Sequence, residues 1–326
     1  MKQRLDEKLF VEINGARQGM FLQSEDIENP VLLFLHGGPG SPEIAFAAEN
    51  STGLEKMFTV CWWEQRGSGI SYHGGIPKET MTMEQMIADT ISVARYLCGR
   101  FRKERLYVMG HSWGSVLGVL TVQRAPELFS AYIGVGQVAR QDESERLAYT
   151  YMLEQFRAAG NRRMVRKLEK FPIDQGGEIS KQYLFVRSEG MMKLGIGIMH
   201  RSRSILDPVK TVLRFKGYTL REKVQFPLGD KLSLSCLWDS VMQSDFIRQV
   251  PRLEIPFYVL QGKYDYQVSY VVAKRFAAAI DAPVKGFYTF EHSAHSPCFE
   301  EPEKMCRILR EDVLRGRASL ADPLEI

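Results

Sequence analysis

The stretch Tyr107-Val-Met-Gly-His-Ser-Trp-Gly-Ser-Val-Leu-Gly-Val119 places one serine, Ser112, between two glycines, after one apolar run and before another. Gly110 and Gly114 complete the pattern Gly-x-Ser-x-Gly, in which a serine occupies a sharp turn between a strand and a helix. Side chains at the two flanking positions would collide in such a turn, so glycine is required there. The turn projects the hydroxyl above the sheet, and the following helix presents free N–H groups to negative charge that develops on a substrate. This stretch therefore predicts that Ser112 is a nucleophile.

Length and composition are those of an ordinary globular protein. Of the 326 residues, 44% are hydrophobic and 25% are charged, so a sizeable core is available. The net charge of +4 is small and the Lys and Arg residues are scattered, which disfavours a nucleic-acid partner. Five cysteines without metal-ligand spacing favour reduced thiols. Neither a signal peptide nor a run of ~20 apolar residues is evident, so we expect a cytoplasmic protein with no membrane span. No metal-ligand spacing or cofactor motif is evident either, so we expect no metal and no cofactor.

Short apolar runs alternate with helical patterns over the first 138 residues. The predicted strands are residues 10–14, 19–23, 31–35, 58–63, 106–109 and 131–135, the first two joined by an Asn-Gly turn. Helical spacing covers 81–101, where Thr82 and Gln85 are expected to form a capping box, and 112–124. Strands that alternate with helices predict a mostly parallel, doubly wound α/β sheet.

The alternation stops between about residue 139 and about residue 250. This segment has helical patterns and carries 20 Lys or Arg against 13 Asp or Glu, so it is basic. Beyond it the alternation resumes with a strand at 257–262, a helix at 271–280, a strand at 286–290 and a closing helix from Pro302. We therefore predict one α/β core, formed by residues 1–138 and 251–326, with a helical cap inserted at 139–250.

The segment HGGPG at 36–40 follows the predicted strand 31–35 and can present N–H groups without side-chain obstruction. Hydrolases with a serine elbow take one oxyanion donor from the residue after the nucleophile, here Trp113. The other donor comes from the loop after an earlier strand, here Gly38. The segment lacks the GxGxxG and P-loop patterns, which disfavours phosphate binding.

A general base and an orienting acid are expected after the serine, in the order Ser, Asp or Glu, His. His292 directly continues a predicted strand, whereas His295 lies in the loop before the closing helix, so we favour His295. The acid should end the preceding strand, which points to Asp265, with room for one helix and one strand before His295. Asp281 is the alternative acid, although its Asp-Ala-Pro context is typical of a turn.

Six segments together resemble the α/β-hydrolase superfamily, and within it the proline iminopeptidase-like branch. They are HGGPG (36–40), EQRGSG (64–69), GHSWGS (110–115), GKYD (262–265), SAH (293–295) and FEEP (299–302). The resemblance implies a metal-free serine hydrolase in which Ser112 attacks a carbonyl and His295 acts as base and then as acid. Asp265 would hold the imidazole, and the two predicted amides would bind the oxyanion. Glu64 in place of the usual aspartate, and His111 where many members have glycine, weaken the transfer of peptidase activity.

A proline iminopeptidase must bind a charged N-terminal amine, which requires carboxylates near the nucleophile. Glu143, Glu145 and Glu154 of the predicted cap are candidates, and a solvated helix face is the other interpretation of these residues. The Met-rich segment 191–200 either lines an acyl pocket or packs within the cap.

Three functions remain open on the sequence. The first is a serine hydrolase of a small ester or amide, with an N-terminal aminopeptidase for proline or other small residues as a special case. The second is a carbon–carbon bond hydrolase or lactonase on the same fold. The third is a non-enzymatic member that binds a ligand. The expected partner is a small molecule or a short peptide.

Overall fold

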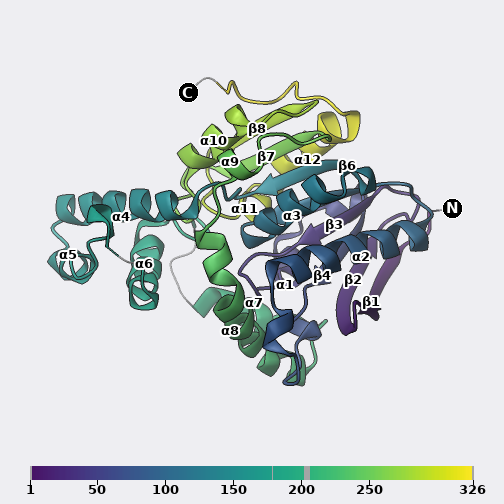
Figure 1. The fold of residues 1–326 in the computed structure, drawn as a ribbon, viewed down its shortest axis with the longest axis horizontal. Coiled ribbons are helices and arrows are strands. Elements are labelled where there is room, and N and C mark those ends of the chain that lie inside the picture. Colours follow the sequence, from purple (N-terminus) through teal and green to yellow (C-terminus); the bar gives the residue numbers. More distant parts are fainter. Residues whose placement is uncertain (1, 178, 202–205, 325–326) are drawn as a thin grey trace.

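The computed structural model describes residues 2–177, 179–201 and 206–324, and its centre is one eight-stranded sheet (Figure 1). The strands are β1 (Leu5–Ile13), β2 (Ala16–Ser24), β3 (Val31–Leu35), β4 (Thr59–Glu64), β5 (Leu106–His111), β6 (Phe129–Val135), β7 (Phe257–Gly262) and β8 (Lys285–Phe290). Their order is β1-β2-β4-β3-β5-β6-β7-β8. β2 pairs antiparallel with β1 and β4, and every other neighbouring pair is parallel. The predicted mostly parallel sheet is confirmed.

Helices follow the strands as the α/β pattern requires. They are α1 (Ile44–Asn50), α2 (Met83–Phe101), α3 (Trp113–Arg124), α4 (Gln141–Ala158), α5 (Arg162–Leu168), α6 (Lys181–Leu194), α7 (Leu206–Arg214), α8 (Leu220–Met242), α9 (Phe246–Gln249), α10 (Tyr270–Ala279), α11 (Pro297–Glu300) and α12 (Pro302–Glu311). Across the described residues, none of these helices combines the length and the apolar character needed to cross a membrane.

The central strands are apolar along their whole length because both faces of the sheet are covered. In β3, Val31, Leu33 and Leu35 pack into a cluster that includes residues of α2, α3 and α10. Leu32 and Phe34 point to the opposite face and pack with residues of α1 and α12. All five side chains are buried. Such unbroken apolar runs are typical of parallel strands between two helical layers.

The start of α2 departs from the predicted capping box. The Thr82 hydroxyl accepts a hydrogen bond from the Gln85 N–H at 3.2 Å, as expected of an N-cap residue. The Gln85 side chain does not return to Thr82 but donates to Asp89 at 2.8 Å. Asp89 is buried and forms an ion pair with Arg66. The Gln85 amide therefore binds this charged acceptor instead of the Thr82 backbone.

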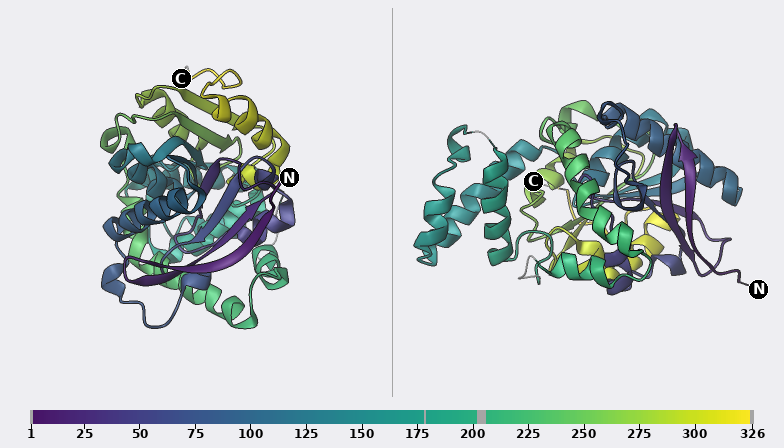
Figure 2. Two further views of the ribbon diagram at one scale, coloured as in Figure 1. Left: turned by 90° about the vertical axis from the view of Figure 1, so that its right-hand side faces the viewer. Right: turned by 90° about the horizontal axis from the view of Figure 1, so that it is seen from below.

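Between β6 and β7 the chain forms the helices α4 to α9. α4, α5 and α6 share a hydrophobic cluster of their own and project away from the sheet, as Figures 1 and 2 show. α8 instead packs on the main core through Leu237 and Val241, and α7 packs against α1. The described part of the segment is therefore mainly helical. The helices α4, α5 and α6 form one group, whereas α7 and α8 lie over the carboxyl ends of the parallel strands.

Candidate active site

Ser112 lies in the turn that joins β5 to α3. Its φ of 54° is a value that non-glycine residues rarely adopt. A methyl group added at Gly110 would lie 2.2 Å from the Gly114 carbonyl oxygen, and one added at Gly114 would lie 1.9 Å from the Leu35 carbonyl oxygen. One neighbour is a backbone atom of α3 and the other a backbone atom of β3, so neither can move aside as a flexible side chain would, and this turn requires both glycines.

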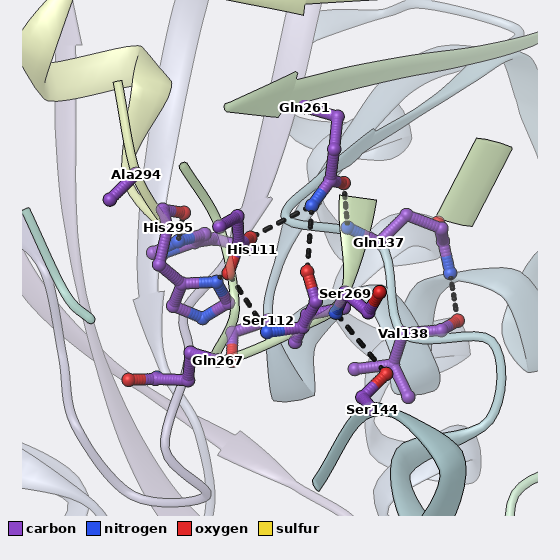
Figure 3. A network of polar contacts seen from close by, with 12 residues as sticks. His111, Ser112, Gln137, Val138, Ser144, Gln261, Gln267, Ser269, Ala294 and His295 are labelled. Atoms are coloured by element: carbon purple, nitrogen blue, oxygen red, sulfur yellow. Dashed lines mark hydrogen bonds and ion pairs between the residues drawn. The ribbon is translucent and has the colours of Figure 1, made fainter. Parts of the chain in front are cut away.

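His295 and Asp265 form a buried ion pair. His295 lines the same cavity as Ser112, and both residues are labelled in Figure 3. Asp265 Oδ2 lies 2.8 Å from His295 Nδ1 and also accepts from the Gln261 side chain at 2.8 Å, while Oδ1 accepts from the Val268 N–H at 2.8 Å. Because an ionised carboxylate only accepts, Nδ1 carries the proton and Nε2 has a free lone pair. Nε2 is buried without a hydrogen-bond partner among the described residues, which suits a group that accepts a proton from a hydroxyl.

The two alternative residues occupy other surroundings. His292 is exposed, and its backbone N–H donates to Glu301 at 3.1 Å. Asp281 is also exposed and lies 3.8 Å from Arg252 across the surface. Neither residue lines the cavity at Ser112.

The loop after β3 is held against the elbow by Gln65. The Gln65 backbone N–H donates to His36 Nε2 at 3.1 Å, and its side-chain oxygen accepts from the Trp113 indole at 2.8 Å. His36 Nδ1 donates to the Gly37 carbonyl at 2.9 Å, and burial lowers the pKa of His36 to about 4, so this imidazole is neutral. The amides of Gly38 and Trp113 donate no hydrogen bond to any other residue in the described ranges. Neither amide is therefore committed to an acceptor within the described residues, as the oxyanion prediction requires.

A second buried acid–histidine pair adjoins the first. His111 Nδ1 lies 2.5 Å from Glu43 Oε1, and Nε2 lies 2.8 Å from the His295 carbonyl oxygen. A carbonyl oxygen only accepts, so Nε2 donates and a further proton lies between Nδ1 and Oε1. Burial acts against protonation, but the Glu43 carboxylate outweighs it and raises the pKa of His111 above its usual value. The rings of His111 and His295 are 4.9 Å apart, side by side in Figure 3.

The cavity that contains Ser112 and His295 has a volume of about 490 Å³. Its apolar lining comes from α1, the segment before α7, α7, α8 and α11, and consists of Phe46, Ile198, Met199, Pro208, Val209, Val212, Leu213, Phe226, Pro227 and Phe299. Of the described carboxylates, Glu43 and Asp230 line it. The cavity thus combines an apolar wall with two acidic groups, one from the sheet domain and one from α8.

A second cavity of about 380 Å³ adjoins the first. The two share the lining residues Phe46, Ile198, Met199, Pro208 and Gln267. The Met-rich segment 191–200 lines the second cavity through Met191, Met192, Gly197, Ile198 and Met199, and Met191 and Ile196 also belong to the cluster of α4 to α6. The segment therefore lines a cavity with some side chains and packs within the cluster of α4 to α6 with others, and an acyl group in that cavity stays a prediction.

A family model described as the alpha/beta hydrolase fold matches residues 30–302. The chain belongs to the α/β-hydrolase family. This match spans most of the chain and confirms both the fold class and the family resemblance inferred from the six motifs.

Curated relatives of this α/β-hydrolase include peptidases. The "Probable aminopeptidase YbaC" of Bacillus subtilis is 34% identical over 299 residues, which covers 92% of this chain and 93% of the relative. A proline iminopeptidase of Heyndrickxia coagulans is 20% identical over 316 residues, covering 92% and 96%. Among solved structures, the proline iminopeptidase of Mycobacterium smegmatis superposes with a TM-score of 0.70 at 18% identity, covering 95% of this chain and 98% of the other. At that identity the structural match shows the fold alone.

The three glutamates expected to bind an amine lie outside both cavities of this α/β-hydrolase. Glu145 is buried and lies 2.7 Å from Arg187 Nε, and Glu143 lies 2.6 Å from Arg275. Glu154 is exposed on α4. The expectation is corrected for a physical reason: α4 directs two of its carboxylates toward arginines of neighbouring helices and the third toward solvent.

Glu64, which replaces the usual aspartate of the family, ties the α/β-hydrolase sheet to the inserted helices. Its Oε2 accepts from the Ile70 N–H at 2.6 Å, and Oε1 accepts from the hydroxyl of Tyr218, which precedes α8, at 2.5 Å. Burial raises the pKa of Glu64 to about 7. The residue does not line the cavity at Ser112, so its contribution is to the attachment of α8.

Sequence analysis missed the two acidic residues that do line the cavity. Glu43 follows the HGGPG segment by three residues, so its proximity to an expected oxyanion donor was an available signal. Asp230 sits in the middle of the 23-residue helix α8, where the local pattern does not distinguish it from a solvated acid.

Other reactive side chains do not gather into a site. The five cysteines are free thiols. Within the described ranges, no three His, Cys, Asp or Glu side chains are arranged to hold a metal ion.

Proposed function

We propose that this α/β-hydrolase is a serine hydrolase that removes the N-terminal residue from short peptides or other aminoacyl amides. The observation that carries the proposal is that Ser112 and His295 line one cavity, where His295 Nε2 has no hydrogen-bond partner among the described residues and Asp265 is bound to the opposite nitrogen. The choice of an aminopeptidase is supported by the 34% identical relative, which is named a probable aminopeptidase, and by the acidic groups in the cavity.

In the proposed reaction, Ser112 Oγ attacks the carbonyl carbon while its proton passes to His295 Nε2. Asp265 stabilises the resulting imidazolium through its bond to Nδ1. The amides of Gly38 and Trp113 donate to the oxyanion that forms as the carbonyl π electrons move onto oxygen. The tetrahedral intermediate collapses, His295 donates the proton to the departing amine, and an acyl-enzyme remains. Water, deprotonated by His295, then releases the acid and restores the serine.

One observation favours a second candidate, an esterase or a lactonase for an uncharged acyl group. The wall of the first cavity is mostly apolar, and the cavity that adjoins it adds the apolar side chains of Met191 and Met192. An ester or lactone with an aliphatic chain would gain about 25 cal/mol for each Å² of apolar surface buried there.

A paired assay separates the two candidates. Prolyl- and alanyl-naphthylamide are compared with p-nitrophenyl acetate and butyrate, using the wild type and Ser112→Ala. Release from the aminoacyl amides that disappears in the variant supports the aminopeptidase, and release from the esters alone supports the second candidate. If Ser112→Ala releases product as fast as the wild type, Ser112 is not the nucleophile.

The base is tested by a matched pair of substitutions. His295→Ala is expected to lower kcat by ~10³-fold or more, because it removes the proton acceptor. His292→Ala removes an exposed imidazole from the same loop and should leave kcat unchanged. If His292→Ala loses kcat and His295→Ala does not, the assignment of His295 as the base is wrong.

We also propose that the protein acts in the cytoplasm on small-molecule or short-peptide substrates. The five free thiols, an odd number, suit a reducing compartment.

A further inference from the structure

The chemistry of an aminopeptidase restricts where its amine-binding group can lie. In an aminoacyl substrate the α-nitrogen is about 2.5 Å from the carbonyl carbon, as bond lengths and the backbone angle dictate. The carbonyl carbon must in turn approach the nucleophile to about 3–3.5 Å. A carboxylate that binds the ammonium group must therefore lie next to Ser112. Glu43 and Asp230 are the described carboxylates that line the cavity there.

Glu43 faces the same small space as the nucleophile. A point at the ideal β-carbon position of Gly37 is 3.3 Å from Glu43 Oε1 and 3.3 Å from Ser112 Cβ. The Glu43 side chain is 10% exposed, and its Oε2 is buried without a partner in the described part of the chain. A buried carboxylate oxygen without a donor is costly, so a ligand with an N–H group would satisfy it.

His111 makes a buried carboxylate tolerable at this position. A bare negative charge beside Ser112 would oppose the oxyanion that must form during attack. The proton shared by His111 and Glu43 keeps the pair neutral, and the bond of His111 to the His295 carbonyl fixes the imidazole. Only Oε1 is occupied by His111, which leaves Oε2 for a donor from the substrate.

Asp230 differs from Glu43 in its surroundings. It extends from α8 and accepts a hydrogen bond from the Ser41 hydroxyl at 2.5 Å. Lys223 of α8 also lines this cavity, and its ammonium group donates to the Leu213 carbonyl at 2.7 Å. Each carboxylate thus has one partner, but only Glu43 has an oxygen that is buried without a partner among the described residues, so Asp230 serves as the comparison for Glu43.

We propose that Glu43, held in place by His111, binds the α-ammonium group of the substrate and selects for a free N-terminal amine. This inference rests on the proposed aminopeptidase function. It assigns recognition of the amine to the sheet domain beside the nucleophile, whereas sequence analysis expected it from α4.

The test uses two substrates that differ in the amine and also in the leaving group, so each variant is compared with the wild type on the same substrate. Alanyl-naphthylamide carries the ammonium group, and p-nitrophenyl propionate presents the same acyl skeleton without it. Glu43→Gln keeps the size and the contact with His111, and is expected to lower kcat/KM for the alanyl substrate by about 10- to 100-fold, the loss typical of a hydrogen bond between charged groups. Its kcat/KM for the propionate should stay within about 3-fold of wild type. Asp230→Asn should leave the ratio of the two activities unchanged.

Several outcomes would overturn the inference. An equal loss on both substrates would assign Glu43 a structural role, and a selective loss in Asp230→Asn alone would move the amine site to α8. If thermal unfolding shows that Glu43→Gln does not fold, Glu43→Asp replaces it. This variant withdraws the carboxylate by one methylene and should reduce the same ratio, so an unchanged ratio refutes the assignment. A wild-type enzyme that cleaves the propionate and never the alanyl substrate would refute the proposed function itself, and the inference with it.

Discussion

Replacing Asp265 with Asn changes one acceptor-only group into a group with one acceptor and one donor. Three donors point at the native carboxylate: His295 Nδ1 and Gln261 Nε2 toward Oδ2, and the Val268 N–H toward Oδ1. The asparagine side chain has nearly the same shape, so the substitution tests hydrogen bonding and charge rather than packing.

Each orientation of the new amide leaves a mismatch. If its NH₂ group replaces Oδ1, it faces the Val268 N–H, and a buried donor loses its partner at a cost of about 1–3 kcal/mol. If the NH₂ group replaces Oδ2, it faces the Gln261 amide and His295 Nδ1. The imidazole then moves its proton to Nε2 and can no longer accept one from Ser112. The expected loss in kcat is about 10³- to 10⁴-fold.

The measurement is kcat for p-nitrophenyl propionate, with urea unfolding of both proteins as the control for folding. Asp265→Asn should unfold at a lower urea concentration, by an amount that corresponds to about 1–3 kcal/mol, and should remain folded in the assay. A folded variant that retains more than one tenth of the wild-type kcat would refute the role of Asp265 as the residue that orients His295.

Two further predictions concern stability. Gly114→Ala should lower the free energy of unfolding by about 3 kcal/mol or more, because its methyl group would lie 1.9 Å from the Leu35 carbonyl oxygen. Gly99→Ala adds a methyl group on the exposed face of α2 that meets no atom of the described residues within 4 Å, so it should raise the free energy of unfolding by about 0.5–1 kcal/mol. Equal urea midpoints for the two variants would contradict the close approach at the elbow. For Glu64, burial raises the pKa from 4.5 to about 7, so the folded state holds the proton more tightly and stability should decline by about 3 kcal/mol as the pH rises from 4.5 to 7. Glu64→Gln, compared with wild type by unfolding at pH 5 and pH 8, should abolish that decline; an unchanged pH dependence in the variant would assign it to other groups.

The sheet and the order of the site residues were predictable because each has a local signature. A parallel strand buried on both faces is a short apolar run, and β3 was predicted with its bounds correct. The glycines at 110 and 114 are dictated by contacts within the turn itself, so they appear in the sequence as a motif. His295 and Asp265 could be placed because they follow two consecutive strands of one sheet.

The walls of the cavity were not predictable in the same way. Helical patterns indicate that the inserted segment is helical, but they do not show which side of a helix faces Ser112. Glu145 looked like a candidate on its own helix, but Arg187 lies opposite it on α6, a contact that no local pattern encodes. Asp230 enters the cavity because α8 packs against Gly40, where its backbone comes within 2.9 Å of the ideal β-carbon position. Such contacts between distant segments depend on tertiary packing.

The shared lining of the two cavities has a consequence for inhibitor design. The proposed nucleophile and the proposed oxyanion donors lie in segments by which this chain resembles its family, so a reactive group directed at Ser112 alone is expected to discriminate poorly between relatives. Ile198 and Met199 line both compartments and belong to the inserted segment rather than to those motifs. A covalent inhibitor with an apolar arm that passes these two side chains would draw its selectivity from the part of the chain that the catalytic chemistry does not constrain.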